Sequence, residues 1–213
     1  MKRARDSRGR RGFRALALVV YGAMVLAALG IAWARGASVL STTPTEPALD
    51  SSIASVGLGV VLAALTIGST RWIVLGTRWG RTLRDDFRAL LADATPSDAV
   101  WLAVSSGVGE ELLFRGALVP WWGWLASSLA FGVLHVGPSR RFLGWTLWAS
   151  SLGALLALIF ETTGRIEGCV VAHVLINAVN LRFVLAFEGR LDTPRAPPGE
   201  QALVSRRVRR DTR

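Results

Sequence analysis

Residues 99–118 read AVWLAVSSGVGEELLFRGAL, an apolar run long enough to cross a membrane but interrupted by Glu110, Glu111 and Arg115. About 20 apolar residues span the roughly 30 Å hydrocarbon core of a bilayer. A carboxylate at that depth costs roughly 2.5–3.5 kcal/mol on insertion scales, so a charge inside such a run indicates a functional group. The stretch therefore predicts a membrane-spanning helix that carries functional charge.

The rest of the chain is similarly apolar. Of its 213 residues, 51% are hydrophobic and nine are tryptophan, and the mean hydropathy is +0.40. An ordinary soluble domain cannot bury this much apolar surface. We therefore predict an all-α fold, a polytopic transmembrane helix bundle of about six spans, with a tight turn at Pro120 between the third and fourth. The predicted spans are Phe13–Trp33, Ser52–Leu75, Ala99–Val119, Trp121–Val136, Phe142–Phe160 and Ile166–Phe187.

Basic residues lie at the ends of the chain and between the apolar runs. The formal net charge is +10, but the arginines do not line one amphipathic face as in a nucleic-acid-binding protein. They concentrate in the first fourteen residues, in Arg71–Arg88, at residues 140–141 and beyond residue 190. The positive-inside rule then predicts an inner-membrane protein with both termini cytoplasmic. The lipid bilayer is an expected partner, and nucleic acid is not.

Three parts are predicted along the chain. Residues 1–98 hold two N-terminal membrane anchors and a cytoplasmic amphipathic segment, Thr77–Asp98, with apolar residues every three or four positions. Residues 99–187 form a four-helix core, in which small residues such as Ser106 and Gly109 allow close helix packing. Residues 188–213 form a basic, proline-containing tail that we expect to be disordered.

Polar residues within the core are organised by helical spacing. Glu111 and Arg115 are four residues apart and can form an ion pair, and His173 and Asn177 share one helix face for the same reason. Glu110 points about 100° away from its neighbour. We therefore interpret Glu111 and Arg115 as a structural pair, and expect Glu110 to face a working site. Its other members are predicted to be His135, His173 and Asn177.

Three motifs carry a family resemblance. They are E-E-L-L-F-R at residues 110–115, F-G-V-L-H at 131–135 and H-V-L-I-N at 173–177. Together they resemble the CPBP family of CAAX prenyl proteases and bacteriocin-processing (Abi) intramembrane proteases, whose pattern is E-E-x-x-x-R, F-x-x-x-H and H-x-x-x-N or D. The resemblance implies an intramembrane endopeptidase acting on a membrane-associated protein or peptide, such as a CAAX-like or leader-peptide substrate. The implied catalytic residues are Glu110, Glu111, Arg115, His135, His173 and Asn177.

Two forms of this chemistry remain open. Without a metal, Glu110 is the general base, His135 orients the same water, and His173 with Asn177 donates hydrogen bonds to the developing oxyanion. Alternatively, Glu110, His135 and His173 hold a catalytic zinc ion and Glu111 becomes the base. The helical H-E-x-x-H motif of typical zinc proteases is absent from the sequence. The expected cofactor is therefore either none or zinc.

Other functions also fit parts of the pattern. Cys169 lies four residues before His173, as a thiol protease could require, although a membrane-buried cysteine usually packs as a small apolar residue. A non-enzymatic membrane adaptor or bacteriocin self-immunity protein could keep the same polar residues for packing. A proton-coupled carrier is a third class, but the paired broken helices typical of transporters are not evident. The sequence gives no indication of oligomeric state.

Overall fold

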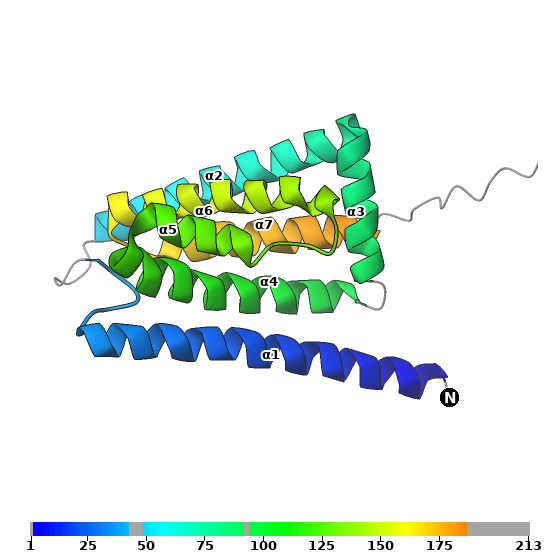
Figure 1. Ribbon diagram of the computed structural model, residues 1–213, viewed down its shortest axis with the longest axis horizontal. Helices are drawn as coiled ribbons and strands as arrows, with labels where there is room; N and C mark the ends of the chain where they lie inside the picture. Colours follow the sequence, from blue (N-terminus) through cyan, green and yellow to red (C-terminus); the bar gives the residue numbers. More distant parts are fainter. Residues whose placement is uncertain (1, 43–48, 92–93, 187–213) are drawn as a thin grey trace, which may run out of the picture.

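The fold is a bundle of helices, as predicted from the apolar runs (Figure 1). The computed structural model describes residues 2–42, 49–91 and 94–186. Phe187, at the end of the predicted sixth span, and the predicted tail 188–213 lie outside the described residues. The helices are α1 (Lys2–Arg35), α2 (Leu49–Gly76), α3 (Arg78–Leu90), α4 (Pro96–Glu111), the π-helix η1 (Leu112–Leu118), α5 (Val119–Val133), the 3₁₀-helix η2 (Arg140–Phe142), α6 (Leu143–Thr163) and α7 (Glu167–Ala186).

Four helical segments in the described part of the chain are long and apolar enough to cross a membrane. This protein is therefore a membrane protein. The four segments are Arg14–Arg35, Leu49–Gly76, Arg140–Thr163 and Glu167–Ala186. The other two predicted spans differ from simple straight helices: one changes from α4 to η1 immediately after the paired glutamates, and the other is the 15-residue α5.

The turn predicted at Pro120 is wrong by three residues. Pro120 lies in the first turn of α5, which follows η1 without a break, so the chain stays helical through the proline. The helix instead breaks at Gly123, whose φ of 81° and ψ of 163° suit a residue without a Cβ. The returning arm, residues 124–133, is about 15 Å long at 1.5 Å per residue. His135 at its end therefore reaches only part of the depth of a full span.

The amphipathic helix α3 lies across one end of the bundle (Figure 1). Its predicted start is confirmed, because the Thr77 side chain caps the helix by accepting from the Gly80 N–H. Its predicted end at Asp98 is wrong, since α3 ends at Leu90. Asp98 instead belongs to α4, whose first turn has a reciprocal capping box between Thr95 and Asp98.

Asp98, one residue before the apolar run, also fixes the N-terminal helix. Its Oδ1 accepts from Arg14 Nε at 2.5 Å. Burial alone would raise the pKa of Asp98, but hydrogen bonds from Thr95 and the pairing with Arg14 together hold this pKa below its ordinary value. The carboxylate therefore stabilises both the start of α4 and the contact with α1.

Helix α7 packs against both α2 and α4. The contact with α2 depends on glycine: a Cβ atom built at Gly59 would lie 2.2 Å from the Gly168 carbonyl oxygen, and one built at Gly168 would lie 1.9 Å from the Ser55 oxygen. On the other side, a Cβ at Gly107 of α4 would lie 2.6 Å from the Val174 side chain. This close packing brings the polar residues of α7 against the paired glutamates of α4.

Candidate active site

A cavity of about 660 Å³ opens among the helices, next to α3. Most of its wall is apolar, and four of the six predicted catalytic residues line it: Glu110, His135, His173 and Asn177. Glu111 and Arg115 are not among the lining residues and are buried, with 0% and 1% of their surfaces exposed. The helical geometry therefore separates the adjacent glutamates into one at the cavity and one behind it, as the spacing predicts.

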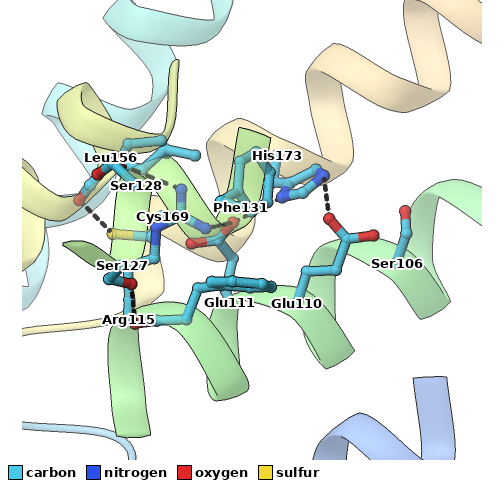
Figure 2. A network of polar contacts seen from close by, with 12 residues as sticks. Ser106, Glu110, Glu111, Arg115, Ser127, Ser128, Phe131, Leu156, Cys169 and His173 are labelled. Carbon is cyan, nitrogen blue, oxygen red and sulfur yellow. Dashed lines mark hydrogen bonds and ion pairs between the residues drawn. The ribbon is translucent and has the colours of Figure 1, made fainter. Parts of the chain in front are cut away.

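Glu111 holds two partners through one oxygen. Its Oε1 accepts from Arg115 Nη1 at 2.9 Å, which is the predicted ion pair, and also lies 2.6 Å from His173 Nδ1 (Figure 2). Helical spacing predicts the first contact but not the second, because His173 lies on a different helix. A carboxylate bound to Nδ1 fixes the tautomer and the ring orientation of His173. Glu111 thus positions a residue of the cavity wall.

The two histidines present the same ring nitrogen to Glu110. Nε2 of His135 and Nε2 of His173 each lie 3.8 Å from Glu110 Oε2. These separations exceed a direct hydrogen bond, and the buried Oε2 atom has no hydrogen-bond partner. His135 donates its Nδ1–H to the Phe131 carbonyl at 2.7 Å, because a carbonyl oxygen can only accept. The Nε2 atom of neutral His135 is therefore an acceptor facing Glu110.

Phe131 connects the two layers of the site. Its ring lies 4.5 Å from the His135 ring and 5.9 Å from the His173 ring, the latter in an edge-on arrangement (Figure 2). On the other side, Arg115 Cζ lies 4.5 Å from the Phe131 ring centroid, a cation–π contact. Arg115 Nη2 also donates to the Gly153 carbonyl at 3.2 Å. The guanidinium thus ties the site to α6.

Asn177 is held by Ser106, a residue that the sequence predicts to allow close helix packing. Its Nδ2 donates to Ser106 Oγ at 3.0 Å, which joins α7 to α4 beside the cavity. The sequence signal that could have indicated this partner is weak, since Ser106 lies one helical turn before Glu110 on the same face. Only the packing of α7 against α4 identifies the pair.

Cys169 is remote from the chemistry of the cavity. It is fully buried, its Sγ donates to the Leu156 carbonyl at 3.1 Å, and it is not a lining residue (Figure 2). A nucleophilic thiol must reach both its base and the substrate. The geometry therefore does not support the thiol-protease interpretation.

Glu110, His135 and His173 are the predicted zinc ligands. Glu110, His135 and His173 direct oxygen and nitrogen donors toward one another. Within residues 2–42, 49–91 and 94–186, however, no three His, Cys, Asp or Glu side chains are arranged so that they could hold a metal ion. The geometry of these residues therefore does not fit a zinc site.

One protein-family model matches the segment that carries the candidate active-site residues. Residues 93–179 match the model of a family described as type II CAAX prenyl endopeptidase Rce1-like. This segment is a CPBP-family domain. The CPBP domain contains all three motifs quoted above, and α1, α2 and α3 precede it.

One curated relative is similar to the chain over 82 residues. The uncharacterized protein YpbD of Bacillus subtilis (strain 168) is 35% identical over 82 residues, which are 38% of this chain and 42% of the relative. The match thus spans less than half the length of that protein. No solved structure matches the chain.

Proposed function

We propose that this protein is an intramembrane endopeptidase in which Glu110 activates a water molecule. One observation carries the proposal: the buried Glu110 Oε2 has no hydrogen-bond partner and lies 3.8 Å from the Nε2 atoms of His135 and His173. The family of the CPBP domain supports a CAAX-type intramembrane protease in general. The role of Glu110 and the nature of the substrate are the parts that we add.

Water activation follows from the positions of Glu110 and His135. A water oxygen about 2.8 Å from each partner can bridge Glu110 Oε2 and His135 Nε2, which are 3.8 Å apart. His135 accepts one hydrogen of this water, and Glu110 takes the other proton as the water oxygen bonds to the substrate carbonyl carbon. Glu110 then returns this proton to the amide nitrogen when the C–N bond breaks. Glu110 is thus the general base first and the general acid second.

Stabilisation of the tetrahedral oxygen is assigned to His173 and Asn177. In this scheme His173 carries a proton on both ring nitrogens before the substrate binds and donates its Nε2–H to the oxyanion, while the Glu111 carboxylate, 2.6 Å from Nδ1, compensates the charge. Asn177 has a second N–H besides the one that it donates to Ser106. Two donors at a low-dielectric site are the arrangement that stabilises an oxyanion most strongly.

The cavity also indicates how a substrate would enter. Its wall includes Trp79, Leu83 and Phe87 of α3, the helix that covers one end of the bundle. This end also carries the basic side chains of α3 and of η2, which the positive-inside rule assigns to the cytoplasm. We propose that the substrate is a membrane-associated peptide, CAAX-like or a leader peptide, whose apolar residues enter from the cytoplasmic leaflet.

Cleavage of a membrane-peptide library by the purified protein tests the proposal. We expect Glu110→Gln to lower the cleavage rate by about 10²–10⁴-fold, the usual contribution of a general base. The matched control is Glu161→Gln, an exposed glutamate on α6 that should leave the rate unchanged. Each protein is assayed with and without a zinc chelator.

Each outcome decides one part of the proposal. A loss only in Glu110→Gln supports the metal-free scheme, whereas a loss on chelation of the wild-type protein replaces it with a metal-dependent one. Equal rates for Glu110→Gln and wild type contradict the assignment of Glu110. Absence of cleavage by every variant, wild type included, contradicts the protease proposal and favours the adaptor alternative.

A further inference from the structure

His135 lies just beyond the helix that leads to it. Helix α5 ends at Val133, so the backbone of His135 is in a turn. Its Nδ1–H is bound to the Phe131 carbonyl, and its own carbonyl accepts from Thr146 Oγ1 at 3.2 Å. Two aromatic rings contact the imidazole, those of Phe131 and Trp145, with centroid distances of 4.5 and 6.0 Å. The direction of Nε2 therefore depends on the side chains packed around this turn.

The segment at the start of α6 supplies part of that packing. Trp145 contacts the imidazole itself. Phe142, which is buried, packs on the backbone two residues after His135, because a Cβ atom at Gly137 would lie 2.1 Å from Phe142 Cγ. Two rings from one short segment thus hold the histidine and the turn that follows it.

Helix α3 contributes a third ring, which packs against both of these. Phe87 lies edge-on to Phe142, with centroids 5.3 Å apart, and edge-on to Trp145, with centroids 5.2 Å apart. Edge-on contacts at this distance are favourable for aromatic pairs. In the part of the chain that the structure describes, Phe87 makes no ring contact with His135. Any influence of Phe87 on the imidazole therefore passes through the two rings between them.

Further contacts fix α3 on the same segment. Trp79 Nε1 donates to the Arg141 carbonyl at 3.1 Å, and Asp86 Oδ2 lies 3.6 Å from Arg141 Nη1. A Cβ atom at Gly144 would lie 2.5 Å from the Trp79 ring. Helix α3 crosses the end of the bundle and lies outside the CPBP domain at residues 93–179 (Figure 1). An element outside the domain thus packs on the segment that supports one of the motif histidines.

We infer that Phe87 is a positioning residue of the active site: acting through the two rings that it contacts, it orients His135. The inference rests on the proposed function, because His135 orients a water molecule only in that reaction. It also gives α3 a part in catalysis, since this helix forms the cavity wall on the proposed entry side. Displacement of α3 should open the cavity and release His135 together, so the active site is complete only when α3 is docked.

Kinetics of Phe87→Leu test the inference. Leucine keeps an apolar side chain in the cavity wall and removes the ring. We expect kcat to fall roughly three- to tenfold with KM within about twofold, because two edge-on contacts are lost while the wall stays apolar. Phe87→Tyr keeps the ring and should retain most of the wild-type kcat. A raised KM with a wild-type kcat in Phe87→Leu would make this side chain a contact of the substrate and overturns the inference.

A matched control separates positioning from stability. Phe160 is a fully buried aromatic residue of α6, the helix that carries Trp145, and it does not line the cavity. Phe160→Leu should lower the thermal unfolding temperature and leave kcat unchanged at a temperature where the variant is folded. If Phe160→Leu lowers kcat as much as Phe87→Leu does, the loss follows from reduced stability and the inference is overturned.

A spectroscopic measurement keeps the inference testable without catalysis. The chain has two histidines, so ¹⁵N-labelled histidine in the full-length protein gives the imidazole NMR signals of His135 and His173 alone. His135→Gln assigns them. We expect Phe87→Leu to shift the His135 signals and leave those of His173, and Phe160→Leu to leave both sets in place.

The NMR and kinetic results have separate consequences. Unshifted His135 signals in Phe87→Leu overturn the inference, as does a wild-type kcat for this variant. Inactivity of the wild-type enzyme overturns the proposed function, whereas the His135 signals still decide whether α3 positions this ring.

Discussion

Replacement of Glu111 by glutamine should separate two roles of this residue, in stability and in activity. Glu111 Oε1 accepts from both Arg115 and His173, at 2.9 and 2.6 Å. Glutamine keeps an oxygen at this position but removes the charge, which leaves the guanidinium of Arg115, 1% exposed, without a counter-ion. Removing one partner of a buried ion pair costs roughly 3–5 kcal/mol. We expect a loss of this size in unfolding measurements in detergent micelles.

The double variant Glu111→Gln, Arg115→Met then distinguishes the roles. Methionine has a similar length, carries no charge and can contact the ring of Phe131 through sulfur. Replacing a whole buried pair by uncharged groups is often neutral, so the free energy of unfolding should return to within about 1 kcal/mol of wild type. Cleavage should stay at least about 100-fold below wild type, because a neutral amide does not compensate a proton on His173.

The refuting result is a joint recovery. If the double variant regains both stability and the wild-type cleavage rate, Glu111 is only a packing partner of Arg115 and does not assist His173. If Glu111→Gln is as stable as wild type, Arg115 does not depend on the charge of Glu111 as its counter-ion. Assaying both variants at one temperature, well below either unfolding transition, ensures that the rates refer to folded protein.

Three further predictions concern packing, the thiol and pH. Gly168→Ala should lower the free energy of unfolding by at least about 1–3 kcal/mol, since its Cβ would lie 1.9 Å from a backbone oxygen. The control is Gly57→Ala, which should leave the free energy of unfolding unchanged because nothing lies within 4 Å of its Cβ. Cys169→Ser should retain most of the cleavage activity, and a complete loss in a folded variant would restore the thiol mechanism. Asp98→Asn should be less stable than wild type at pH 7. Because the folded pKa of Asp98 is lowered, this difference should persist above the unfolded value of about 3.9 and vanish in unfolding curves as the pH falls through the folded pKa; a difference independent of pH would contradict the pairing with Arg14.

Much of the fold follows from the sequence because apolar runs of membrane length have few alternatives to the helix. The position of the turn does not follow, since both Pro120 and Gly123 are ordinary turn residues. The proline is tolerated in the first turn of α5, and the glycine takes the positive φ at the break. Moving the turn by three residues shortens the returning arm and changes the depth of His135. The apolar run therefore predicts that α5 exists, but it does not predict the length of the returning arm.

The candidate site shows the same division between local and tertiary information. Spacing on one helix predicts that Glu111 meets Arg115 and that Glu110 faces elsewhere. The contacts of Glu111 with His173 and of Ser106 with Asn177 join residues that are 62 and 71 positions apart. No periodicity encodes such pairs. They depend on which helix faces pack together, and here small residues such as Gly107 and Gly109 decide that packing.

The adjacent glutamates of this site lie in two different environments. Because successive residues on a helix diverge by about 100°, the carboxylates of Glu110 and Glu111 cannot face the same volume. Oε1 of the inner carboxylate is occupied by Arg115 and His173, and Oε2 of the outer one is without a hydrogen-bond partner at the cavity. A base has to be free to take a proton, whereas a positioning carboxylate has to be bound. These contacts support the proposal that Glu110 is the base and that Glu111 prepares His173.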